Sequence, residues 1–233
     1  MSKPSKSERL AVNHPIYCWL LIVFAPVLFA CARPDTRVDL EKLSGVDTIL
    51  VLPFQHIDTV EIEPVIIDCK LCRQRHVFEA VATDDAVFMS TRLMDLLHNV
   101  ETFQYIFHDQ AQRTSPDLNV DRLVRKDTVD ILPSDAIATG VDAVLMGYIF
   151  RFRERVGTSY GIESPASVAF SLILTSLEDS QVVWHSHYEE TQDALFNNLL
   201  TLGKFIRRKA RWVTARELAN EALEDMLSTL EKP

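Results

Sequence analysis

An uncharged apolar run near the N-terminus sets the first limit on what this chain of 233 residues can fold into. Residues 16–30 (IYCWLLIVFAPVLFA) carry no charge, and three basic residues against one acid precede them. A helix of this length reaches only about 22 Å. The hydrocarbon core of a bilayer is about 30 Å thick, and a helix needs about twenty residues to cross it. A basic start followed by a short apolar core is typical of a secretory signal. We therefore expect residues 1–30 to be a signal peptide outside the folded domain.

The end of this run resembles the lipobox of bacterial lipoproteins. Leu28, Phe29, Ala30 and Cys31 follow its order, although Phe29 is bulkier than the residue usually found there. The resemblance implies that Cys31 is acylated and becomes the mature N-terminus, so that the chain is attached to a membrane through acylated Cys31. Several acyl chains on one residue hold a protein durably to a bilayer. A plain N-terminal anchor is the alternative.

The residue after Cys31 bears on the location. In enteric bacteria an Asp at this position favours the inner membrane, and this chain has Ala32 instead. By that analogy we expect a lipid-anchored protein on the periplasmic face of the cell outer membrane. Without the leader, the chain has 21 basic and 32 acidic residues, a net charge of −11. This acidity argues against a nucleic-acid partner, which requires a broad positive surface.

The remaining sequence predicts one α/β domain. Residues 31–45 are polar, so we expect a lipidated tether there and a periplasmic domain with C-terminal helices over residues 46–233. Short β-branched runs indicate strands at 47–54, 103–107, 141–156, 167–177 and 182–188. Apolar residues at helical spacing indicate a helix that Thr83 caps, and Thr214 with Glu217 forms a capping box before a last helix. The order predicts a mixed sheet of four to five strands packed by helices.

Several of these segments together resemble one group of envelope lipoproteins. They are residues 49–54 (ILVLPF), 140–148 (GVDAVLMGY), 174–179, 182–184, 190–192 and 211–212. They are similar to periplasmic lipoproteins related to the curli secretion-channel lipoprotein and to the activator lipoproteins of penicillin-binding proteins. The resemblance implies a non-enzymatic adaptor or activator that binds another cell-envelope protein. A ring-forming component of an outer-membrane secretion or transport assembly is the alternative.

The connection over residues 157–165 favours the adaptor. A strand that spans a membrane needs about 9–11 residues, and this segment is too short to cross and return. The identity of the partner and the oligomeric state stay open.

Two cysteines remain once Cys18 leaves with the leader and Cys31 is acylated. Cys69 and Cys72 predict a local disulfide in an oxidising compartment. A zinc site needs about four ligands, and these cysteines with His76 supply three. A periplasmic redox or metal-binding protein that uses Cys69 and Cys72 is therefore the alternative interpretation.

A pair of histidines lies on one predicted strand. His185, His187 and Glu189 alternate along the sequence and should point to the same face of the sheet. Such a pair can bind a metal, but the sequence offers no further ligand nearby. We therefore expect a polar sheet face there and no metal.

Six basic residues form one dense cluster near the C-terminus. They are Lys204, Arg207, Arg208, Lys209, Arg211 and Arg216. We expect either a solvated helix junction or a contact for an anionic lipid, glycan or acidic partner. Arginines at 151, 153 and 155 alternate with aromatic residues at 148, 150 and 152, which predicts a basic face that could extend this cluster.

Signatures of catalysis are missing from the sequence. It has no GxSxG elbow, Walker loop, GxGxxG or HExxH motif, and nothing selects a pair among its many acids. We therefore expect no catalytic residues, no cofactor and no enzymatic activity.

Overall fold

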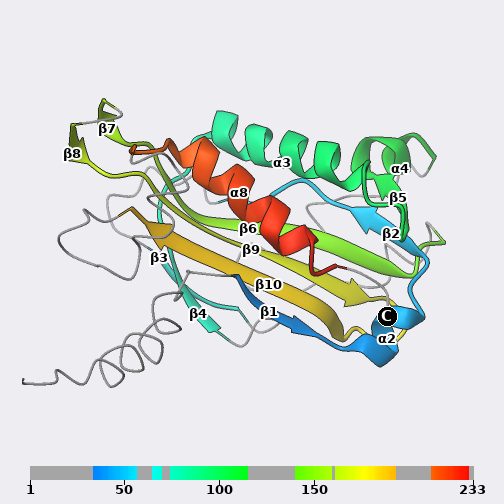
Figure 1. Cartoon of the computed structure of the whole chain (residues 1–233). Helices are drawn as coiled ribbons and strands as arrows, with labels where there is room; N and C mark the ends of the chain where they lie inside the picture. The colour runs from blue at the N-terminus through cyan, green and yellow to red at the C-terminus, as the bar shows by residue number, and fades with distance from the viewer. Residues whose placement is uncertain are drawn as a thin grey trace, which may run out of the picture.

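A mixed sheet of six strands runs through the computed structural model, which describes residues 34–56, 65–69, 74–114, 140–158, 161–192 and 211–230. The strands lie in the order β1 (Asp35–Val38), β10 (Val182–Thr191), β9 (Ser167–Ser176), β6 (Ala143–Arg153), β2 (Thr48–Val51) and β5 (Gln104–Phe107) (Figure 1). Strands β6, β2 and β5 are parallel, and β1, β10, β9 and β6 are antiparallel. The predicted mixed α/β domain is confirmed, with six strands where four to five were expected.

The strand that the sequence does not predict comes from the expected tether. β1 pairs with β10, and the hydroxyl groups of Thr36 and Ser186 lie 2.8 Å apart. The short helix α2 (Leu40–Ser44) follows, capped by Asp39 and holding Leu43 fully in the core. Residues 35–44 are therefore folded, not a free linker. Their polar composition hides the strand because β1 lies at the edge of the sheet and three of its four residues are exposed.

Two long helices cover one face of the sheet (Figure 1). They are α3 (Thr83–Leu97) and α8 (Ala215–Leu227), and the capping box of Thr214 and Glu217 begins α8 as predicted. For α3, the N-cap is Ala82, so the predicted cap at Thr83 is wrong by one position. Sheet residues that pack beneath these helices are fully buried, among them Leu145, Phe170, Leu172, Leu174 and Trp184. Because each buried side chain of this size contributes about 1.5–3 kcal/mol, this face is the main source of stability.

One glycine lets a loop lie close to this core. A Cβ added to Gly147 would meet the ring of Phe54. The absence of a side chain at 147 lets the Phe54 ring pack closely against β6, where it also contacts Phe170 edge-on at 5.9 Å.

A hairpin lies on the opposite face of the sheet. β3 (Val65–Cys69) and β4 (Gln74–Phe78) pair antiparallel, and Phe78 joins a second core with Leu50, Met146 and Ile173. The sequence shows no clear period there, because each strand has only five residues and one side of the hairpin faces out. The polar sequence of residues 108–118 predicts a loop, but this segment begins with the helix α4 (His108–Thr114).

A β-bulge changes the faces predicted for β6. The pairing with β9 shifts between Ile149 and Arg151, so Phe150 is an extra residue in the strand. As a result Tyr148 and Phe150 lie in the core beneath the hairpin, whereas Phe152 packs with the helices. The single aromatic face predicted from alternation is therefore wrong.

After β6 the chain forms the small pair β7 (Val156–Gly157) and β8 (Ile162–Ser164), in the segment predicted to turn. The sequence also predicts short helices within residues 119–140 and a helix over residues 195–206, and these segments lie outside the described residues except for Gly140. In the portion that is described, none of the helices has the length and apolar character needed to span a bilayer.

Candidate functional site

In the sequence, the predicted acylation site lies just before the first strand of the sheet. Cys31 lies outside the described residues, but Asp35, four residues later, begins β1. Because an extended chain spans at most about 3.3–3.6 Å per residue, the Cα atom of Cys31 lies within about 14 Å of that of Asp35. An acyl group on Cys31 would therefore hold this edge of the sheet close to its membrane.

Polar side chains gather on the hairpin side of the sheet, next to this edge. His185, His187 and Glu189 share one face of β10, as predicted. Asp35 is the register partner of His187 on β1, and Arg37 is the partner of His185. We call His76, His185 and His187 the histidine cluster, because β4 brings His76 against the same face.

Aromatic packing holds the cluster together. The ring of His76 stacks on Phe150, with centroids 4.0 Å apart and an angle of 4° between the planes. The centroids of His76 and His187 are 5.0 Å apart, and Phe78 meets Phe150 edge-on at 4.8 Å. The bulge at Phe150 thus provides the surface on which the hairpin rests.

Burial lowers the pKa of all three histidines. The pKa of His76 falls to about 4, first through burial and then through His187 and His185. The pKa of His185 also falls to about 4, through burial, His187 and Arg37. Burial also lowers the pKa of His187, while Glu189 and Asp35 raise it and Arg151 lowers it further. The cluster is therefore neutral at neutral pH, and charging it opposes the folded structure.

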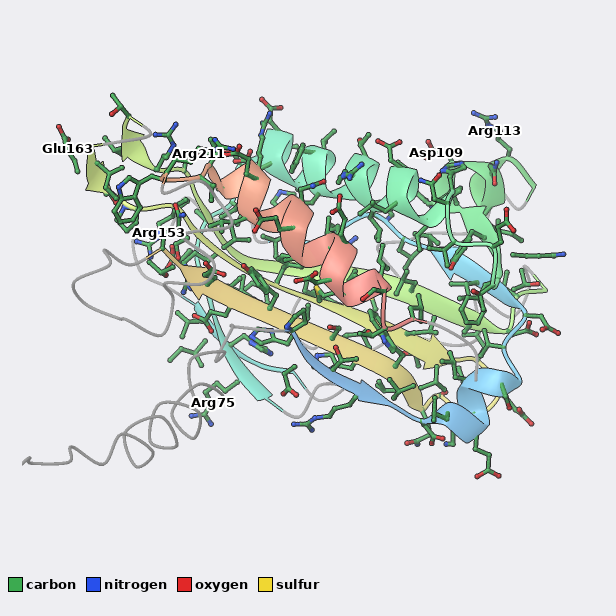
Figure 2. The ribbon with its side chains drawn as sticks, viewed as in Figure 1. Arg75, Asp109, Arg113, Arg153, Glu163 and Arg211 are labelled. Carbon is green, nitrogen blue, oxygen red and sulfur yellow. The ribbon has the colours of Figure 1, made fainter. Side chains whose placement is uncertain are left out.

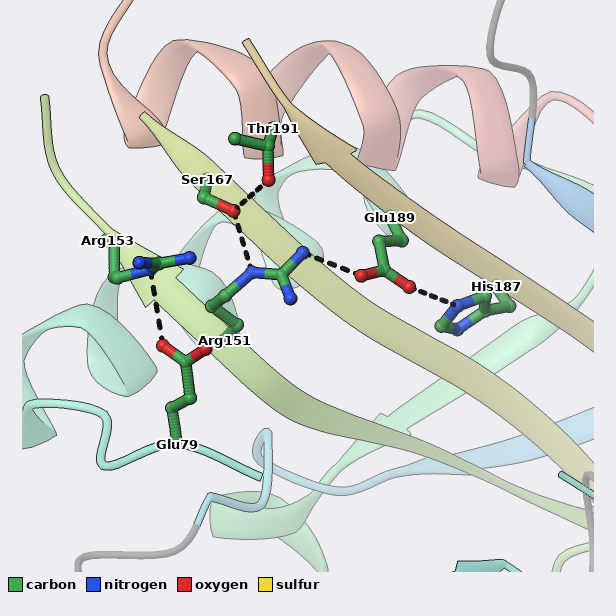
Figure 3. A network of polar contacts seen from close by, with 7 residues as sticks. All are labelled: Glu79, Arg151, Arg153, Ser167, His187, Glu189 and Thr191. Atoms are coloured by element: carbon green, nitrogen blue, oxygen red, sulfur yellow. Dashed lines mark hydrogen bonds and ion pairs between the residues drawn. The ribbon is translucent and has the colours of Figure 1, made fainter. Parts of the chain in front are cut away.

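A chain of polar contacts leads away from His187 (Figure 3). Its Nδ1 atom lies 2.8 Å from the Ser171 hydroxyl, and its Nε2 atom is 4.0 Å from Glu189. Glu189 accepts a hydrogen bond of 2.7 Å from Arg151, whose Nε atom donates to Ser167 at 2.7 Å.

A second ion pair ties the hairpin to β6. Arg153 pairs with Glu79 at 3.2 Å, and the backbone N–H of Glu79 donates to the Phe150 carbonyl at 2.8 Å (Figure 3). Arg151 and Arg153 thus serve contacts within the domain.

A polar atom of the cluster is buried without a hydrogen-bond partner. Among the described residues, this holds for the Nε2 atom of His185. The same part of the chain holds no group of three or more His, Cys, Asp or Glu side chains placed to bind a metal ion. What the arrangement can do chemically is respond to protons, because protonation would place charge in a buried site.

The structure describes only Arg211 and Arg216 of the predicted basic cluster. Lys204, Arg207, Arg208 and Lys209 lie outside the described residues. Arg211 donates to Glu217 at 2.6 Å, and Arg216 pairs with Asp85 at 3.2 Å while lying over the Phe88 ring. These two arginines therefore stabilise the start of α8 and its contact with α3. Arg155 donates to the Gly157 carbonyl at the small strand pair.

The predicted disulfide stays a prediction. Cys69 ends β3, but its side chain and the whole of Cys72 lie outside the described residues.

The sequence reasoning missed His76 as a partner of His187. The residues of β4 alternate between exposed and buried from Arg75 to Phe78. That short alternation was the available signal, but five residues do not show which sheet the strand covers.

Comparisons with known proteins come from structure. No protein-family model matches this chain, and no curated protein sequence matches it. The chain is similar to the PelC dodecamer from Paraburkholderia phytofirmans, with 12% identity and a TM-score of 0.46, over 85% of this chain and 98% of that chain.

Two solved lipoproteins are also similar. Lipoprotein GNA1162 from Neisseria meningitidis has 12% identity and a TM-score of 0.37, over 70% of this chain and 93% of that chain. The LpoB C-terminal domain from Salmonella enterica has 13% identity and a TM-score of 0.31, over 66% and 96%. Because all these TM-scores are below 0.5, we argue the function from this chain's own residues. The resemblance to the curli secretion-channel lipoprotein stays an expectation.

Proposed function

We propose that this chain is a lipid-anchored protein of the cell envelope whose folded domain acts as a non-enzymatic adaptor or activator of another envelope protein. The observation that carries the proposal is the position of Cys31, between an apolar leader and the first strand of the domain. Only residues 31–34 separate the end of the leader from the first strand, so an acyl group on Cys31 would be joined to the folded domain by a very short segment.

We place the anchored domain on the periplasmic face of the outer membrane, because Ala32 and not Asp follows Cys31. The net negative charge of the domain suits a protein partner better than a nucleic acid.

The anchor is tested by labelling growing cells with radioactive palmitate. The wild-type chain should incorporate the label and fractionate with membranes, because Cys31 carries the acyl chains. Cys31→Ser should lose the label and accumulate with its leader uncut. Cys18→Ser is the matched control, since this cysteine lies within the leader, and it should behave as wild type. A wild-type chain without palmitate would refute the anchor.

The adaptor role is tested on the acylated protein in detergent. Cross-linking in intact cells, followed by purification, should recover one partner in a fixed ratio to this chain. A mass of many copies of this chain alone would favour the ring-forming alternative. Reductant-dependent activity or bound metal that Cys69→Ser abolishes would favour the redox or metal-binding alternative.

A further inference from the structure

We propose that the outward face of the β3–β4 hairpin lies on the lipid surface and inserts Ile66 and Val77 among the lipid headgroups. This inference rests on the acyl anchor at Cys31 proposed above. It adds a second contact with the membrane, made by the folded domain itself.

The first support is an exposed apolar pair. Ile66 and Val77 are register partners on β3 and β4, so their side chains lie side by side on the hairpin. Their exposed fractions are 62% and 49%, while the neighbouring His76 and Phe78 point inward and are buried. Two adjacent aliphatic side chains on the outside of a short hairpin gain free energy by leaving water, and an interface with acyl chains offers that.

The second support is the distance from the anchor. The histidine cluster links the hairpin to the first strand, because His76 contacts His187, and Asp35 is the register partner of His187. Val77 follows His76 directly in β4. Each step is short: neighbouring strands are about 5 Å apart and stacked sheets about 10 Å apart. The distance from Asp35 to the hairpin is therefore similar to the distance of about 14 Å that the chain can span between Asp35 and Cys31.

The third support is the side of the sheet. The histidine cluster and Asp35, the register partner of His187, lie on the face that the hairpin covers. Helices α3 and α8 cover the other face (Figure 1). A domain held by a short tether at this edge can turn its hairpin to the bilayer. Arg75 projects from the same outward side of β4 (Figure 2).

The test measures contact with lipid at one position. The acylated chain with Cys69→Ser and Cys72→Ser receives Val77→Cys, and the new thiol is labelled with bimane. The protein is reconstituted in vesicles of phosphatidylethanolamine and phosphatidylglycerol that contain a doxyl-labelled lipid. We expect quenching several-fold stronger than for Val87→Cys, the matched control on α3, whose exposed fraction is 58%.

Each outcome decides a separate point. Equal quenching at positions 77 and 87 would overturn the inference while leaving the anchor intact. A parent chain without palmitate would remove the anchor before any vesicle is made. If Ile66→Asp with Val77→Asp changes the mass of the protein in detergent, the hairpin contacts a second copy and the lipid proposal is wrong. Thermal unfolding of each labelled variant checks that the domain is folded.

Discussion

The two faces of the sheet differ in what they bury. Beneath α3 and α8 the packing is apolar, and Phe170, Leu172 and Trp184 have no exposed surface. Beneath the hairpin, aromatic residues share the space with the histidine cluster, whose His185 Nε2 atom is buried without a hydrogen-bond partner. Burial of apolar side chains on the first face stabilises the folded domain. On the second face, burial of ionisable histidines away from water costs part of that free energy of folding. The comparison suggests that the helix face holds the domain together and that the hairpin face is its responsive side.

The largest loss of stability should follow from removing a large side chain that is packed beneath α3 and α8. Phe170→Ala removes a fully buried ring that contacts Phe54 and Tyr188. We expect the free energy of unfolding to fall by about 3–5 kcal/mol, because the cavity adds to the lost burial. Urea unfolding followed by circular dichroism measures it. Phe150→Ala on the hairpin face should cost less, since a short hairpin can settle into the gap. Equal costs would contradict the difference between the faces.

Acid should act on the hairpin face. Burial lowers the pKa of His185 from its ordinary value of 6.5 to about 4 in the folded domain, so the unfolded chain binds the proton first as the pH falls. Its contribution to stability is complete above about pH 6.5 and is lost as the pH falls toward 4. His185→Leu should remove about 2 kcal/mol of this loss near pH 4.5 and change little near pH 8. Thermal unfolding at both pH values checks it, and parallel curves for the two proteins would refute the role of His185.

Helix capping should have a smaller effect. The hydroxyl of Thr214 accepts from the Glu217 N–H at 3.1 Å, and Glu217 accepts from the Thr214 N–H at 2.8 Å. Thr214→Ala should cost about 1 kcal/mol, because it leaves an N–H group of α8 without its partner. Urea unfolding measures this change. Thr36→Ala, which removes a hydroxyl contact at the sheet edge, is the comparison and should cost less. A larger loss at Thr36 would show that the edge strand matters more than the helix cap.

The smallest effect should come from the polar chain in Figure 3. Arg151→Met removes the contact with Glu189, whose side chain is half exposed, and the hydrogen bond to Ser167. The Ser167 hydroxyl keeps Thr191 as a partner at 2.6 Å, so the free energy of unfolding should fall by about 1 kcal/mol or less. Arg151 lowers the pKa of His187, so that pKa should rise in the variant. An NMR titration of the His187 ring measures the shift. A lower pKa would show that Glu189 moves away once Arg151 is gone.

What the sequence predicts well are the elements with a long, regular pattern. The apolar spacing from Ala86 to Leu97 indicates α3, and the capping box indicates the start of α8, because both signals are local. The HxH pair also predicts a polar sheet face at β10. The face of a strand is a local property, so these predictions need no knowledge of the partner strands.

The rest depends on contacts between distant segments. β1 escapes detection because three of the four residues of this edge strand are exposed, so the strand needs no apolar run. The bulge at Phe150 is one inserted residue, which an alternating sequence does not reveal. His76 joins the site only because the hairpin folds over β6, and its five-residue strand carries too short a period to place it.

The pairing of β1 with β10 has a consequence for the order in which the molecule is completed. The contact between Thr36 and Ser186 joins residues 150 positions apart, so a chain that emerges from its N-terminus must wait for its last strand before the first can dock. Until β10 has formed, Asp35–Val38 have no strand to pair with, so the sheet edge that follows the proposed acylation site is completed late in folding.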